Sequence, residues 1–305
     1  MRHATRAALL LLLTGTACSS SRRSELAPPT GNAAPAPTAT APSDDVVDVA
    51  TLMGNDNEVA DYLVLPVLEP CSGEVQVGAA LRLATWNMKA ARDAPIERVA
   101  QEIAAMDVDL IALQEVDVSA RRTGELDQPR LLGESLGYAY TFAAALYWDG
   151  GVYGLAVLSR VPFVSVERHR LDDVASSEPR IALDVTVCRA GLPVRVIGVH
   201  ADVEPSAAAR QVTLAAELAL GDASAHVALV GDFNQAPFEP GPTAASEGGL
   251  VDLFAGDERP TAFGRRIDYV FASAGLARDF TRAELWQTSV SDHHALLVDF
   301  TLAPP

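Results

Sequence analysis

The chain has 305 residues, 49% of them apolar, which is enough to build the core of one large domain or two small ones. Its formal charge of −17 disfavours non-specific adhesion to nucleic acid or anionic lipid, because such adhesion depends on Lys and Arg contacts with phosphate. A phosphorylated substrate is not excluded, since a divalent cation can supply positive charge locally.

The first 18 residues have the features of an export signal. Arg2 and Arg6 precede the apolar run Ala7–Leu13, which is shorter than the roughly 20 residues that span a bilayer. Small residues then lead to Cys18. This pattern resembles a bacterial lipoprotein signal, although Gly15 stands where an aliphatic residue is usual. We expect residues 1–18 to be a signal peptide and the protein to be exported and anchored by a lipidated Cys18. It would face the periplasm or the cell exterior, and simple secretion is the alternative.

The next two segments differ in composition. Residues 19–43 are rich in Ser, Ala, Pro and Thr, cannot bury enough apolar surface to fold, and are expected to form a disordered tether. Residues 44–78 are an N-terminal extension of unclear structure that can add an edge element to the following domain. Cys71 and Cys188 remain after Cys18. In an oxidising compartment they either form a disulfide or stay as two buried thiols.

Residues 79–303 are expected to form a single domain of alternating strands and helices. Short apolar runs predict the strands, and residues at helical spacing or in an Ala-rich run predict the helices. Because many strands are neighbours along the chain and helices are few, the pattern favours two packed sheets with helices outside. Predicted strands cover 81–86, 108–113, 138–144, 155–158, 163–170, 180–188, 194–199, 227–230, 267–271 and 294–300, predicted helices 96–103 and 206–220, and a predicted loop 146–154.

Residues suited to metal binding and proton transfer stand at the ends of these strands. In the run Val227–Asn234, Asp232 and Asn234 follow a buried strand two residues apart, so they point to the same side. Each such residue has an ordinary explanation, such as a turn, a surface charge, a core histidine or a structural ion pair. Their repeated occurrence indicates a metal and phosphate site. The full set is Asn87, Glu115, His200, Asp232, Asn234, Asp268, Asp292 and His293.

The motifs around these residues resemble those of the endonuclease/exonuclease/phosphatase superfamily, which has the DNase I-like fold. They occur in the order of that family, within residues 79–302. They are Thr85-Trp86-Asn87, Leu113-Gln114-Glu115-Val116, Gly154 to Arg160, Gly198-Val199-His200, Gly231-Asp232-Phe233-Asn234, Arg266 to Val270 and Ser291-Asp292-His293. The resemblance implies a four-layer α/β/β/α sandwich of two mixed sheets and a metal-dependent phosphoester hydrolase.

The resemblance also implies roles for single residues. Glu115, Asn87 and Asp292 would form the metal shell. Their oxygen atoms suit Mg²⁺, with Mn²⁺ as a substitute. In the reaction itself, Asp232 would activate the attacking water and Asn234 would hold the phosphate. His293 would contact phosphate oxygens with Asp268 on its other ring nitrogen, and His200 would stabilise charge or pass a proton.

The substrate is left open, because loops set it and the fold does not. A lipid head group or a small phosphodiester or phosphomonoester is favoured, since the basic groups are small. The alternatives are an extracellular nuclease acting on DNA or RNA and, from another class, an inactive binding lipoprotein. Beyond the substrate and a membrane, no protein partner is indicated, and a monomer is expected. Tyr153 and Trp148 lie near the site motifs without an assigned role, and Trp148 can equally pack on the domain edge.

Overall fold

The structure is a computed structural model that describes residues 54–171, 176–221 and 226–304. The predicted signal peptide 1–18, the tether 19–43 and the first part of the extension 44–78 lie outside the described residues. In the parts of the chain that are described, no helix is both long and apolar enough to cross a membrane.

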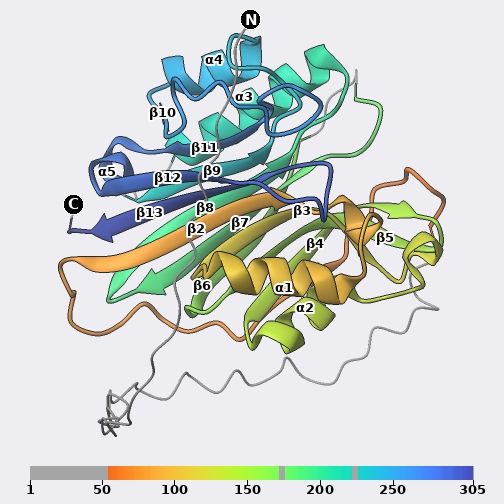
Figure 1. The fold of residues 1–305 in the computed structure, drawn as a ribbon, viewed down its shortest axis with the longest axis horizontal. Helices are drawn as coiled ribbons and strands as arrows, with labels where there is room; N and C mark the ends of the chain where they lie inside the picture. The colour runs from red at the N-terminus through yellow and green to blue at the C-terminus, as the bar shows by residue number, and fades with distance from the viewer. Residues whose placement is uncertain (1–53, 172–175, 222–225, 305) are drawn as a thin grey trace, which may run out of the picture. The chain divides into compact units, whose positions relative to one another are not determined.

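The described residues form two mixed β-sheets with helices on their outer faces (Figure 1). The seven-stranded sheet has the order β1 (Leu63–Val64), β4 (Ala139–Trp148), β5 (Gly151–Ser159), β3 (Leu110–Val118), β2 (Ala79–Asn87), β13 (Ala295–Leu302) and β12 (Phe280–Trp286). The six-stranded sheet has the order β10 (Val251–Asp252), β11 (Asp268–Ala272), β9 (Val227–Asp232), β8 (Leu192–His200), β7 (Ile181–Arg189) and β6 (Phe163–Arg170). The helices are α1 (Ile96–Met106), α2 (Gln128–Leu136), α3 (Pro205–Leu220), α4 (Pro240–Glu247) and α5 (Ala274–Arg278), with 3₁₀ turns η2 (Lys89–Ala91) and η3 (Arg121–Thr123).

Three apolar layers hold these elements together. The central layer lies between the two sheets and contains, for example, Leu83 and Val196. A second layer packs α1 against the seven-stranded sheet around Ile103 and Trp86, and a third packs α3 against the six-stranded sheet around Val212. Figure 1 shows α1 and α2 on one outer face and α3 and α4 on the other. The predicted four-layer α/β/β/α sandwich is therefore confirmed.

Strand direction brings the polar strand ends to one rim. β2 and β3 are parallel, and so are β8 and β9, so the carboxyl ends of each pair lie together. β11 runs antiparallel to β9 and β13 antiparallel to β2, so the starts of β11 and β13 reach the same rim. Asp268 begins β11 and His293 precedes β13, so these two site residues stand at strand starts, whereas Asn87, His200 and Asp232 end their strands.

The structure also corrects and extends the predicted elements. The predicted loop 146–154 is wrong, because β4 and β5 continue through it as a hairpin that turns at Asp149 and Gly150. The helices α2 and α4 and the strand β12 are not among the predicted elements. The extension does add an edge element, since β1 pairs with β4.

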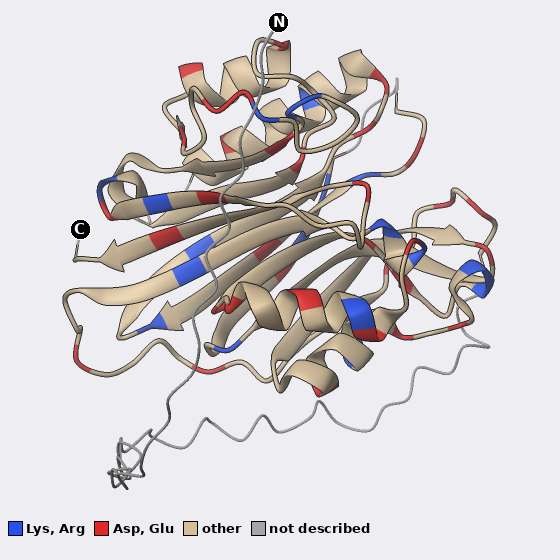
Figure 2. Ribbon diagram, in the orientation of Figure 1, with Lys and Arg blue, Asp and Glu red and all other residues tan. Residues whose placement is uncertain are grey.

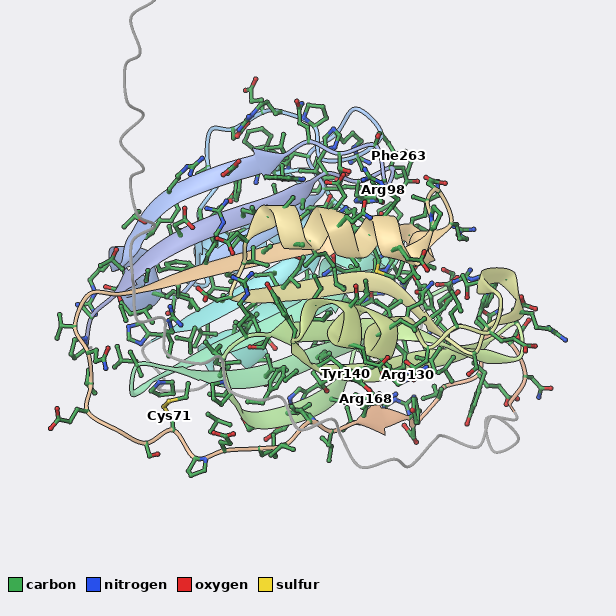
Figure 3. The ribbon with its side chains drawn as sticks, turned by 60° about the horizontal axis from the view of Figure 1, so that its bottom comes forward. Cys71, Arg98, Arg130, Tyr140, Arg168 and Phe263 are labelled. Carbon is green, nitrogen blue, oxygen red and sulfur yellow. A yellow bond between two sulfur atoms is a disulfide. The ribbon has the colours of Figure 1, made fainter. Side chains whose placement is uncertain are left out.

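A disulfide links the extension to the six-stranded sheet. Cys71 bonds to Cys188 near the end of β7, across 117 residues of sequence. Figure 3 shows Cys71 at the lower left of the view and Phe263 at the upper right. The disulfide therefore lies at the other end of the domain from Phe263.

Candidate active site

The end of β9 places Asp232 and Asn234 at the rim. Gly231 has φ 136°, and a Cβ at this position would lie 2.0 Å from the carbonyl oxygen of Val199 on β8. Only glycine combines that backbone conformation with so close an approach to the neighbouring strand. Asn234 has φ 50°, and its backbone N–H donates to Asp232 Oδ1 at 2.9 Å. The turn therefore fixes the carboxylate of Asp232.

Asp232 is a buried carboxylate whose second oxygen faces three nitrogen donors. Asn87 Nδ2 donates to Asp232 Oδ2 at 3.1 Å, and the Nε2 atoms of His200 and His293 lie 3.6 and 3.7 Å from the same oxygen. Burial, with the nearby charge of Asp268, raises the pKa of Asp232 to about 7. A carboxyl group with this pKa exchanges protons readily near neutral pH.

His293 is paired with Asp268. His293 Nδ1 lies 3.0 Å from Asp268 Oδ2, and both side chains are buried. Burial opposes a positive charge on His293, but the charge of Asp268 and the hydrogen bond to it outweigh burial and raise the pKa of His293 to about 9. His293 is therefore an imidazolium at neutral pH, with Nδ1–H directed to Asp268 and Nε2–H toward Asp232.

Backbone anchors hold this segment against β2. Trp86 Nε1 donates to the carbonyl oxygen of His293 at 3.0 Å, and Ser291 Oγ donates to the carbonyl oxygen of Asn87 at 2.8 Å. These two bonds fix the segment within the seven-stranded sheet, and from there His293 reaches Asp268 of the six-stranded sheet.

His200 has the opposite electrostatic environment. Burial, together with the positive charges of Arg180 and His293, holds the pKa of His200 well below its ordinary value. Its Nδ1 lies 3.2 Å from the hydroxyl of Tyr153, and burial raises the pKa of Tyr153 well above its ordinary value. Tyr153 therefore stays protonated and donates to Nδ1, which places the proton of neutral His200 on Nε2.

Glu115 and Asn87 meet at the ends of β3 and β2. A β-bulge interrupts the pairing between Leu113 and Val116, and Glu115 within it has φ 54°. Bulges next to active sites redirect a side chain, and strained backbone conformations cluster at such sites. Asn87 Nδ2 donates to Glu115 Oε1 at 3.1 Å, so the amide joins Glu115 to Asp232.

Asp292 lines the same pocket as Glu115. Its Oδ2 lies 2.9 Å from Lys89 Nζ, which also contacts Asp93 at 2.8 Å. Glu115 and Asp292 are carboxylates open to a shared pocket, and hard oxygen ligands of this kind fit a Mg²⁺ ion. The predicted metal residues are thus brought to one place by segments far apart in sequence.

A second group of possible ligands lies deeper. The ligand atoms of Asp232, Asp268 and His293 lie within 4.8 Å of one another, so this buried cluster could hold a metal ion by its spacing. However, metal binding to an imidazole requires its neutral form, whereas Asp268 keeps His293 charged. We therefore regard the three residues as a proton and charge relay and the carboxylates at the pocket as the better metal ligands.

The pocket above these residues is open and has a volume of about 350 Å³. Its lining includes four Lys and Arg side chains, although the whole chain is strongly acidic. Figure 2 shows Lys and Arg scattered over many elements rather than gathered in one strip. The positive charge near the acidic residues is therefore local, which suits a compact anionic ligand. The Lys and Arg residues of the lining are Lys89, Arg92, Arg122 and Arg180, and the imidazolium of His293 lies beside them.

Two of these arginines are held by carboxylate partners. Arg122 binds both oxygens of Asp117 at 2.8 Å, and its guanidinium lies 5.4 Å from the ring centre of Trp148 and 5.3 Å from that of Tyr153. Arg180 is 5% exposed and pairs with Glu178 at 2.9 Å. Trp148, which the sequence leaves without a role, is therefore a pocket wall as well as part of the core.

All eight predicted site residues lie at this rim. Six of them line the pocket, Asn87 donates to Glu115 and Asp232, and Asp268 pairs with His293. Sequence reasoning left Tyr153 unassigned and did not single out Asp117, Lys89 or Arg122. The only sequence signal for Tyr153 is its position directly before Gly154, which opens a site motif. Its partner His200 is 47 residues away, so no local pattern relates the two.

Comparison with known proteins agrees with this geometry. A family model described as "Endonuclease/Exonuclease/phosphatase family" matches residues 84–293. Among curated proteins, no sequence matches the chain. A solved structure of an endonuclease/exonuclease/phosphatase from Beutenbergia cavernae is 26% identical with a TM-score of 0.59, covering 74% of this chain and 72% of that one.

Two other solved structures show the same fold at lower identity. The catalytic domain of human Nocturnin with bound sulfate is 22% identical with a TM-score of 0.58, covering 74% of this chain and 94% of that one. A mannosyl-6-phosphatase from Bacteroides thetaiotaomicron is 21% identical with a TM-score of 0.55, covering 72% of this chain and 98% of that one.

Proposed function

The chain belongs to the endonuclease/exonuclease/phosphatase family, whose members are phosphoester hydrolases, and from this premise we propose that it is an exported, Mg²⁺-dependent phosphoesterase. Its substrate would be a small phosphodiester or phosphomonoester, or a lipid head group. The observation that carries the proposal is the arrangement around Asp232, a buried carboxylate with a pKa of about 7 that faces two imidazoles at 3.6 and 3.7 Å.

In the proposed reaction Asp232 accepts a proton from water while the water oxygen bonds to phosphorus and the ester P–O bond breaks. The departing ester oxygen keeps the electron pair of that bond, takes up a proton from solvent and leaves as the alcohol. The N–H of cationic His293 donates to a phosphate oxygen, and Asp268 keeps that imidazole charged and oriented. Neutral His200 presents Nε2–H to the same region. One amide proton of Asn234 is used by the carbonyl oxygen of Ala201 at 3.0 Å, which leaves the other for the substrate.

Glu115 and Asp292, with Asn87 beside Glu115, would hold Mg²⁺. The bound ion would neutralise phosphate charge and stabilise the charge that develops during the reaction. Lys89 holds Asp292 in place and adds positive charge at the same side of the pocket.

A small substrate is favoured over a nucleic acid by the charge distribution. Proteins that bind nucleic acid place Lys and Arg along a broad surface, whereas here the net charge is −17 and four Lys and Arg side chains line one pocket. The structural likeness to a mannosyl-6-phosphatase is in keeping with a small substrate.

The test is hydrolysis of bis-p-nitrophenyl phosphate, p-nitrophenyl phosphate, sphingomyelin, and single-stranded and duplex DNA, each with Mg²⁺ and with EDTA. We expect turnover of the small esters that EDTA abolishes, and a loss of 100-fold or more in Asp232→Asn, as for removal of a general base. The matched control is Asp257→Asn, since Asp257 pairs with Arg259 and does not line the pocket. Activity that survives EDTA would refute the metal requirement, and faster cleavage of DNA than of small esters would favour a nuclease.

We propose export and membrane anchoring on separate grounds. The N-terminal segment with Cys18 supports them, and so does the Cys71–Cys188 disulfide, because disulfides persist in oxidising compartments. Cys18→Ser should move the protein from the membrane fraction to the soluble fraction of cells. An unchanged distribution would exclude lipidation at Cys18.

A further inference from the structure

A two-residue turn beside the catalytic histidine carries an unexpected residue. Ala262 and Arg265 exchange backbone hydrogen bonds of 3.1 and 2.7 Å, and the residues between them, Phe263 and Gly264, have φ 48° and 73°. Tight hairpins with positive φ at both central positions favour Asn-Gly, Asp-Gly or Gly-Gly. A bulky side chain is disfavoured there, so Phe263 makes this turn less stable than Asn would.

The ring of Phe263 is also exposed to solvent. It is 72% exposed, although it lines the pocket, and its ring centre lies 5.6 Å from that of His293 in an edge-to-face arrangement. An exposed ring on a strained turn gains little for folding, because most of its apolar surface stays in water. The residue is therefore explained better by what enters the pocket than by the stability of the fold.

We propose that Phe263 is a specificity-determining residue. Its ring would stack on a flat ring of the substrate, in the group that is esterified to the scissile phosphate. The proposal rests on the proposed function, because the contact of Phe263 with His293 places the ring beside the phosphate-binding imidazole. A bound ring would cover the exposed face of Phe263 and gain the stacking interaction that aromatic pairs provide.

A ring-sized group fits better than a lipid surface. Insertion into lipid requires an apolar face built from several neighbouring side chains, and Phe263 shares the pocket with one other strongly exposed apolar residue, Val203. Phe238 is 98% exposed on the adjacent loop, which the ion pair between Glu239 and Arg265 joins to the turn at 2.7 Å. Phe238 does not line the pocket, so it serves as a control for an exposed phenylalanine without a site.

The test measures binding of phenylphosphonate and methylphosphonate by calorimetry in Mg²⁺, with the full chain as wild type, Phe263→Asn and Phe238→Asn. We expect the wild type to bind phenylphosphonate about fivefold more tightly than methylphosphonate. Phe263→Asn should lose this preference, whereas Phe238→Asn should keep it. The melting temperature of Phe263→Asn should equal or exceed that of the wild type, because Asn-Gly suits the turn.

The results separate this proposal from its alternatives. A wild type without preference, or a preference kept in Phe263→Asn, would overturn it. So would binding to phosphatidylcholine vesicles that both Phe263→Asn and Phe238→Asn lose, since that result indicates insertion into lipid. If the wild type binds neither phosphonate, the ring site is refuted, while hydrolysis that Asp232→Asn abolishes would leave the proposed function standing.

Discussion

The carboxylate of Asp202, two residues after the end of β8, offers a test of what fixes the pocket wall. It is fully buried and accepts hydrogen bonds from the hydroxyls of Ser176 and Ser177 at 2.7 and 2.8 Å. It also accepts from the backbone N–H groups of Ser177, Glu178 and Glu204 at 2.8, 3.3 and 2.9 Å. Asp202 therefore fixes the segment that leads to the pocket residues Glu178 and Arg180.

The magnitude follows from the pKa of this group. Burial opposes the charge on Asp202, but the hydrogen bonds outweigh it and lower its pKa from 3.8 to about 2. At 1.36 kcal/mol per pKa unit this is worth about 2 kcal/mol of unfolding free energy. In Asp202→Asn the amide NH₂ group replaces an oxygen and cannot accept a hydrogen bond from the backbone donors. This adds about 1 kcal/mol to the loss of unfolding free energy. We expect a loss of about 3 kcal/mol at pH 7.

The dependence on pH has a definite sign. Because the folded-state pKa is depressed, the charge contribution of Asp202 is present above about pH 4 and is lost as the pH falls through 2. The difference between the wild type and Asp202→Asn should therefore shrink as the pH is lowered.

The assay is urea unfolding of both proteins at pH 7 and pH 3, with Asp107→Asn as the control because Asp107 is an exposed carboxylate. A loss below 1 kcal/mol at pH 7, or a difference that stays constant between the two pH values, would refute the reasoning. Hydrolysis at pH 7 should show a raised KM in Asp202→Asn, since the segment carrying Glu178 and Arg180 loses its anchor.

Three further changes have predictable outcomes. Gly231→Ala should lower the free energy of thermal unfolding by more than about 2 kcal/mol, because the new Cβ would clash with Val199. Gly249 has φ 109° and open space around it, so Gly249→Ala should cost less, and equal losses would refute the clash. Cys71→Ser should lower the unfolding free energy by about 4 kcal/mol through loss of a long cross-link, and an unchanged urea midpoint would contradict this. Tyr153→Phe removes the donor that fixes the tautomer of His200, so kcat should fall about tenfold with KM little changed, and a change confined to KM would assign Tyr153 to substrate binding instead.

The sequence by itself determined the family, the fold class and the identity of the main site residues. The reason is that a residue such as Asp232 carries a local signal, since it follows an apolar run whose period of two fixes the side on which it points. Such signals depend on residues close in sequence. The predicted strands agree with β6 and β8, whose apolar residues stand close together in sequence, while α2 and β12 went unpredicted.

The tertiary structure decided which of these residues act together. Pairing of β9 with β8 sets His200 opposite Asp232, and pairing of β9 with β11 sets Asp268 opposite Asp232. The β-bulge at Glu115, the hydrogen bond of Tyr153 to His200 and the Cys71–Cys188 bond likewise join residues that no local pattern relates. These contacts arise from strand order and direction, which are set by packing of the two sheets over their whole area. A short stretch of sequence carries no record of that packing.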